Sequence, residues 1–244
     1  MKQSVQMCLA VFMLVFSVIV KADENSDLAK AAALNAASLF KSSFTVKMSS
    51  AEIGALVSSA VSAKAAQMGV PLSIKVKYFV LKCVNGDLAC SVILDVPEQQ
   101  RDMMEPQANQ LLAGTGFSKA LASLSLGALK SAASALENNG DSLALSANYE
   151  QVAQFTLNAP GDALFGKLGI SKVSVNIGKQ YKILLGLRFD FSDGSAAYMQ
   201  YSYDKMDERI VPVKMQIKHN LKQPVGGVQL PAQIIMVFSE YNFD

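Results

Sequence analysis

The sequence predicts an α+β protein in which alanine-rich helices come first and a long antiparallel sheet follows. Three observations lead to this class. The segments before Asp141 are rich in alanine and other strong helix formers. From Asp141 onward, short runs of β-branched and aromatic residues alternate with turn residues. The connections between these runs are too short for parallel crossovers, so neighbouring strands are expected to be antiparallel.

The N-terminus has the pattern of a secretory signal peptide. Lys2 precedes an uncharged apolar stretch from Met7 to Val20, and Val20-Lys21-Ala22 fits a small-residue cleavage site. The stretch is shorter than the roughly 20 residues that a membrane span needs. We therefore expect residues 1–22 to be removed, a periplasmic or secreted location, and a single domain over 23–244 without a transmembrane segment.

The charge balance gives no indication of a polyanionic partner. The chain has 22 basic and 20 acidic residues, and removal of Lys2 and Lys21 leaves 20 of each. No basic run or charged tail is present in the sequence. Nucleic acid is therefore not expected as a partner.

Helices are expected mainly over 26–68 and 118–137. Ser49 and Glu52 have the spacing of a capping box for the second helix, with Met48 placed for a hydrophobic staple. The polar segment between Pro97 and Pro106 is expected to be a loop. The third helix is expected to begin with Ser118 as its N-cap.

A hairpin is expected around the two cysteines that lie outside the leader, Cys83 and Cys90. The segments 72–82 and 88–96 are typical of strands. Asn85-Gly86 between them tolerates the positive φ angles of a tight turn.

The cysteine pairing depends on the register of this hairpin. A two-residue turn places Cys83 opposite Leu88, whereas a loop over 85–88 places it opposite Cys90. An isolated pair in an oxidising compartment favours a structural disulfide, so we expect the longer loop and a Cys83–Cys90 bond. Free thiols and a reactive pair are the alternatives, and a zinc site lacks ligands because His219 is the only histidine.

The sheet is expected mainly over 72–96 and 141–241. Strands of the second part are expected over 142–149, 151–158, 171–178, 181–191, 196–204, 209–219 and 229–241. Alternation over 181–191 and 210–219 gives each strand one apolar face. From Ile234 to Phe238 both faces are apolar, which predicts that helices, a partner or a ligand cover the last strand on both sides.

No set of residues in the sequence makes a convincing catalytic site. Ser118, Asp193 and His219 follow one another in the chain order of some hydrolases, but Ala120 stands where the nucleophile turn needs glycine. His219 is expected to be a strand-end residue with a local hydrogen bond. We predict no catalytic residues, no metal and no cofactor.

The C-terminal quarter, residues 181–244, resembles the closing strands of the periplasmic lipoprotein-carrier superfamily, the LolA/LolB-like proteins. The resemblance lies in Asp207-Glu-Arg-Ile-Val-Pro-Val-Lys-Met and in Gly227-Val-Gln-Leu-Pro-Ala-Gln-Ile-Ile. It implies a curved antiparallel sheet, an incomplete barrel, with the alanine-rich helices packed on its concave face. The helix and hairpin that follow Phe44 depart from the family pattern, so no functional residue is transferred.

These observations predict a secreted or periplasmic, non-catalytic protein that binds a lipid or other apolar ligand in the concavity of the sheet. The first alternative is an envelope protein–protein interaction or assembly factor with no small ligand, and the second is a hydrolase. The expected lining is Leu185, Leu187, Phe189, Met199, Tyr201, Met215, Ile217, Ile234, Met236 and Phe238.

Overall fold

A single antiparallel sheet organises the chain. The computed structural model describes residues 24–67, 75–114, 116–139, 143–157, 169–222 and 229–244, so residues 1–22 of the predicted signal peptide lie outside the described part. Within it, the strand order is β3-β2-β1-β10-β9-β8-β7-β6-β5-β4, and β3 and β4 form two free edges. The strands are β1 Phe44–Ser49, β2 Val76–Val84, β3 Asp87–Leu94, β4 Ala144–Asn148, β5 Val152–Leu157, β6 Ile170–Gly178, β7 Ile183–Phe191, β8 Ala196–Met206, β9 Arg209–His219 and β10 Gln233–Phe243.

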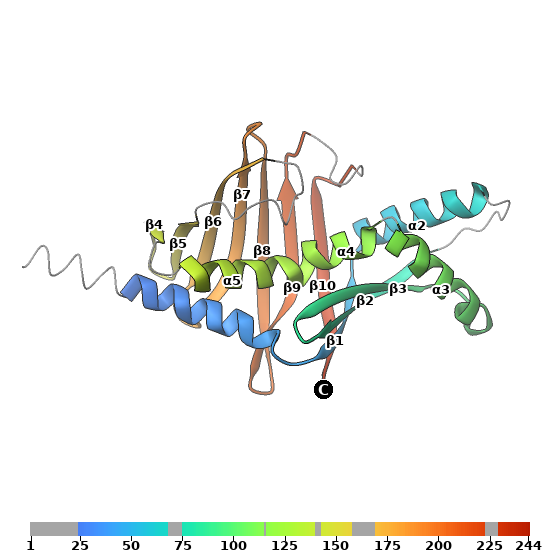
Figure 1. Ribbon diagram of the computed structural model, residues 1–244, viewed down its shortest axis with the longest axis horizontal. Coiled ribbons are helices and arrows are strands. Elements are labelled where there is room, and N and C mark those ends of the chain that lie inside the picture. Colours follow the sequence, from blue (N-terminus) through green and yellow to red (C-terminus); the bar gives the residue numbers. More distant parts are fainter. Residues whose placement is uncertain (1–23, 68–74, 115, 140–142, 158–168, 223–228) are drawn as a thin grey trace, which may run out of the picture.

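The helices lie across one face of this sheet, which we call the inner face (Figure 1). They are a first helix over 24–39, α2 Ala51–Gln67, α3 Glu98–Gly114, α4 Phe117–Ala122 and α5 Ala128–Asn139, with a π-helical turn at Ser123–Gly127 between the last two. The first helix and the α4–α5 segment cross the strands, whereas α2 and α3 lie toward the β2–β3 side (Figure 1). The predicted α+β class with an open, helix-covered antiparallel sheet is confirmed.

Side-chain alternation explains which face is inner. Along β9, Val211, Met215 and Ile217 are buried, whereas Lys214 and Lys218 are exposed. Because side chains in a strand point alternately to opposite faces, the apolar set turns toward the helices and the lysines toward solvent. The sequence period thus fixes the orientation of the strand.

The segment after Pro97 is a helix, not the loop that the sequence predicted. Its first turn is closed by the Pro97 carbonyl, which accepts from the Gln100 amide at 2.9 Å. Along the helix, the Asn109 side chain accepts from the Val92 amide at 2.7 Å and donates to the Val92 carbonyl at 3.1 Å. Glu105, from the segment predicted as a loop, accepts from the Leu94 amide at 3.0 Å. Glu105 and Asn109 thus satisfy backbone groups of edge strand β3, which would otherwise be free to pair with another chain.

Two predicted helix starts are shifted. The cap of α2 is Ser50, not Ser49, because the Ile53 amide donates to Ser50 Oγ at 3.3 Å and β1 extends to Ser49. The α4 helix begins at Phe117 after Gly116, whose φ of 74° lies in the left-handed region, and Ser118 is not its cap. The cap moves by one residue in α2, from Ser49 to Ser50, and by two residues in α4, from Ser118 to Gly116.

The β2–β3 hairpin has the shorter of the two turns that the sequence allowed. Asn85 and Gly86 have φ of 51° and 83°, so Cys83 lies opposite Leu88. Cys90 lies opposite Leu81, and both cysteines are free. The predicted four-residue loop and Cys83–Cys90 disulfide are therefore wrong for this structure, because the tight turn sets the thiols diagonally across the strand pair.

The last strand is covered fully on one face only. Ile234, Met236 and Phe238 are buried on the inner face. On the other face Ile235 is half-buried, and Val237 is 46% exposed. The described chain itself therefore leaves Val237 uncovered, and cover of this face by a partner or a ligand stays a prediction.

Candidate functional site

The ten residues predicted as an apolar lining lie on four neighbouring strands, β7 to β10, in the sheet. Nine of them are buried, with at most 5% of each side chain's surface exposed. These nine are Leu187, Phe189, Met199, Tyr201, Met215, Ile217, Ile234, Met236 and Phe238. The structure therefore brings them together on one face, and their role in binding remains a prediction.

The strand register arranges these side chains in rows across the sheet. Leu187 lies opposite Met199, Met199 opposite Ile217, and Ile217 opposite Ile234. Residues directly opposite each other in an antiparallel pair have their side chains on the same face and in contact range. The row is therefore a continuous apolar strip that spans four strands.

A second row runs beside the first and includes the only hydroxyl among the predicted lining residues. Tyr201 lies opposite Met215, and Met215 lies opposite Met236. Methionine is unbranched and flexible, so a surface rich in it adapts to partners of different shape.

Leu185 is the predicted lining residue that the structure places elsewhere. The β6–β7 register shifts between Asn176 and Ile177, which pair with Gly186 and Leu184. Leu185 is thus the extra residue of a bulge and is only half-buried, while Leu184 is buried with 1% exposure. Strict alternation cannot reveal a bulge, although a glycine within a strand is a sign of one.

The helices close the inner face with short side chains. Ala29, Ala32 and Ala33 of the first helix are buried, as are Ala132 and Ala133 of α5. Larger side chains between them complete one hydrophobic cluster with the sheet, namely Leu121, Leu124, Leu126, Leu129 and Leu136. Sequence analysis identified these helices but did not assign their residues to the site.

Directional contacts hold the helices at the margins of the sheet. Asn35 of the first helix donates to the Lys182 carbonyl in the β6–β7 turn at 2.9 Å. Lys130 of α5 donates to the Gly86 carbonyl at the tip of the β2–β3 hairpin. Together with Asn109 at the β3 edge, these contacts attach the helical layer to the hairpin tips and to an edge of the sheet.

Three tyrosines lie near the end of β8 and β10. The Tyr203 hydroxyl donates to the Leu184 carbonyl, and the Tyr241 hydroxyl donates to the Pro212 carbonyl at 2.7 Å. The Tyr201 hydroxyl is buried and has no hydrogen-bond partner among the described residues. Burial raises the pKa of Tyr201, so this group remains a protonated donor at neutral pH.

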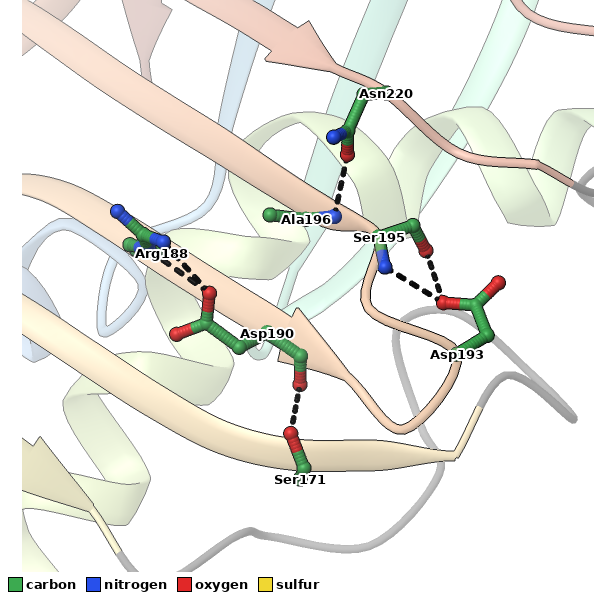
Figure 2. A network of polar contacts seen from close by, with 7 residues as sticks. All are labelled: Ser171, Arg188, Asp190, Asp193, Ser195, Ala196 and Asn220. Carbon is green, nitrogen blue, oxygen red and sulfur yellow. Dashed lines mark hydrogen bonds and ion pairs between the residues drawn. The ribbon is translucent and has the colours of Figure 1, made fainter.

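The residues that follow the chain order of a hydrolase are not assembled into a catalytic site. Ser118 is on α4, which packs against β3, whereas Asp193 is in the β7–β8 turn (Figure 1). There Asp193 accepts from the Ser195 amide at 2.8 Å and from the Ser195 hydroxyl (Figure 2). These hydrogen bonds lower the pKa of the Asp193 carboxyl and identify it as the residue that stabilises the turn.

His219 lies at the end of β9, opposite Ala197 on the inner face. Its Nδ1 accepts from the Leu221 amide at 3.3 Å, which is the local hydrogen bond that the sequence predicted. Its Nε2 is buried and has no partner among the described residues.

Neither a metal site nor a membrane helix is found in the described part of the chain. Within it, no three His, Cys, Asp or Glu side chains gather in a way that suits a metal ion. The same residues include no helix with the length and apolar character needed to cross a membrane.

The fold and the inner face define an α+β protein with an open antiparallel sheet covered by helices. Neither the comparison with protein families nor that with curated proteins gives a match. Among solved structures, a domain named for outer membrane lipoprotein sorting, from Vibrio parahaemolyticus, is similar at 13% identity and a TM-score of 0.46, covering 91% of this chain and 93% of that one.

Two further solved structures are similar to this chain. A LolA superfamily protein from Nitrosomonas europaea has 9% identity and a TM-score of 0.43, covering 90% and 93% of the two chains. A DUF1329 family protein from Desulfovibrio piger has 11% identity and a TM-score of 0.45, covering 91% and 93%.

Proposed function

We propose that this chain is an exported, non-catalytic protein of the periplasm or extracellular space that binds a lipid or other apolar ligand. The ligand would lie between the inner face of β7–β10 and the helical layer. The observation that carries the proposal is the continuous apolar strip across four strands, closed by helices with short side chains. Residues 1–22 are proposed to direct export, and residues 23–244 to form one domain.

The driving force would be removal of the ligand's hydrocarbon surface from water. Each buried methylene contributes about 0.8 kcal/mol, so a long acyl chain needs few polar contacts to bind. Met199, Met215 and Met236 give the lining the flexibility to accept chains of different shape. The short alanine side chains of the helices would leave space for an acyl chain when the helical layer moves away from the sheet.

The same burial supports a second candidate. Nine of the ten lining residues are already covered by the protein itself, so a ligand must displace part of the helical layer. If that layer does not move, the chain is an interaction or assembly factor of the envelope that presents its outer surface to a protein partner.

Native mass spectrometry of the exported protein, purified without detergent, separates the two candidates. A lipid mass that is lost on denaturation and recovered by organic extraction is the result expected for the carrier. The second arm is titration with N-phenyl-1-naphthylamine, a dye that fluoresces in apolar sites. If the protein carries no lipid mass and the dye shows no increase in fluorescence, lipid binding is overturned and the interaction factor is favoured.

A further inference from the structure

Among the buried lining residues, Tyr201, which is 3% exposed, carries a hydroxyl that has no hydrogen-bond partner in the described part of the chain. His219 Nε2, at the end of β9, is a second buried polar atom of the inner face without a partner. Tyr203 is a neighbouring tyrosine for comparison, because its ring centroid lies 6.3 Å from that of Tyr201. The Tyr203 hydroxyl donates to the Leu184 carbonyl. Tyr201 alone of the two lacks an acceptor.

An unpaired buried hydroxyl is costly and therefore calls for an explanation. Most buried polar groups have a partner, and each one left without it loses the hydrogen bonds that water would supply. Phenylalanine would fill the same apolar volume between Met199 and Met215 without this cost. The fold thus gains nothing from the hydroxyl, whereas a ligand with an acceptor would.

The surroundings restrict the chemistry of that acceptor. Tyr201 faces the helices in the row with Met215 and Met236, both of which are fully buried. Tyrosines apart, the buried polar residues in the described part of the chain are four serines, with no lysine or arginine among them. The His219 Nε2 atom is also buried, at the end of β9. A carboxylate placed there would lack a counter-charge, whereas a neutral carbonyl needs only one donor.

We infer that Tyr201 donates a hydrogen bond to the neutral carbonyl oxygen of an acyl ester, whose chain lies along the row of Met215 and Met236. This inference rests on the proposed function and adds the class of ligand: an esterified acyl chain instead of a free fatty acid or a hydrocarbon. The hydroxyl would set the depth at which the ester end stops, and the methionines would contact the chain.

The test compares three competitors of matched chain length against bound N-phenyl-1-naphthylamine: methyl laurate, laurate and dodecane. The wild-type protein is expected to bind methyl laurate about tenfold more tightly than dodecane, and laurate no better than dodecane. Tyr201→Phe should weaken the binding of methyl laurate by about the same factor. The affinities for dodecane and for the dye should stay the same. One neutral hydrogen bond is worth a change of this order.

Tyr203→Phe is the matched control, because it removes the neighbouring hydroxyl from an internal hydrogen bond. It should lower the melting temperature without changing the preference for the ester, whereas Tyr201→Phe should melt at or above the wild-type temperature. Equal methyl laurate affinity in Tyr201→Phe and wild type overturns this inference but leaves apolar binding intact. A wild-type protein that binds neither dye nor competitor overturns the proposed function as well.

Discussion

Adjacent residues of β10 allow a direct test of which face is packed. Met236 is fully buried on the inner face, whereas Val237 on the opposite face is 46% exposed. Met236→Ala removes three heavy atoms from a packed interior and is expected to cost about 2–5 kcal/mol in the free energy of unfolding. Val237→Ala, the control on the same strand, should change it by no more than about 0.5 kcal/mol.

Urea unfolding followed by far-UV circular dichroism measures both variants, since the chain contains no tryptophan for fluorescence. For a protein of this size each kcal/mol shifts the melting temperature by about 2–4 °C, so Met236→Ala should melt roughly 4–20 °C lower. Equal losses at the two positions would refute the assignment of the inner face. If acyl chains bind there, Met236→Ala should also alter the affinity for methyl laurate, and Val237→Ala should not.

Three further changes test other parts of the structure. Asn109→Ala removes both hydrogen bonds to Val92 and should lower the free energy of unfolding by about 1–3 kcal/mol. Because the β3 edge is then uncovered, the variant should also self-associate in size-exclusion chromatography. Gln107→Ala, on the exposed side of α3, is the control. Ser50→Ala should cost about 0.5–2 kcal/mol in urea unfolding through loss of the α2 cap, and Ser49→Ala should cost less. Burial raises the pKa of the Cys90 thiol to about 12, so a thiol reagent at pH 8 should label it slowly in the folded protein and fast in urea. Failure to label in urea would contradict the free thiols.

The strands of the second half were predictable because their pattern is local. The expected strand 209–219 coincides with β9, Arg209–His219, and its apolar alternation gave the correct inner face. A two-residue period can be read from the sequence alone, since one slip would turn every apolar side chain to solvent.

The features that sequence analysis missed depend on tertiary contacts or on single backbone angles. The α3 segment contains Pro106 and has polar side chains, and only its contact with the β3 edge explains why it is helical. The bulge at Leu185 depends on the pairing of β6 with β7, which the sequence of either strand does not reveal. Nine of the ten predicted lining residues are therefore buried on the inner face, and the prediction is wrong only at Leu185, in the bulge.

The unpaired Tyr201 hydroxyl is a different case, because its residue was identified as lining but its missing partner was not. Tyr201, Tyr203 and Tyr241 have the same side chain, and nothing in their sequence context indicates which hydroxyl finds a carbonyl. Only the register of β8 and β10 separates the two satisfied groups from the free one.

A closed interior and ligand binding are compatible if different contacts control them. Apolar packing has no preferred direction, so an acyl chain can replace helix side chains against the methionines at a small net cost in free energy. The hydrogen bonds from Asn35 to Lys182 and from Lys130 to Gly86 are directional and fix where the helical layer rests. The inner face would then set the affinity for the acyl chain. The hydrogen bonds at the margins of the sheet would set how often the helical layer moves away from it. Tyr201 is the one lining residue where a directional contact would enter the affinity itself.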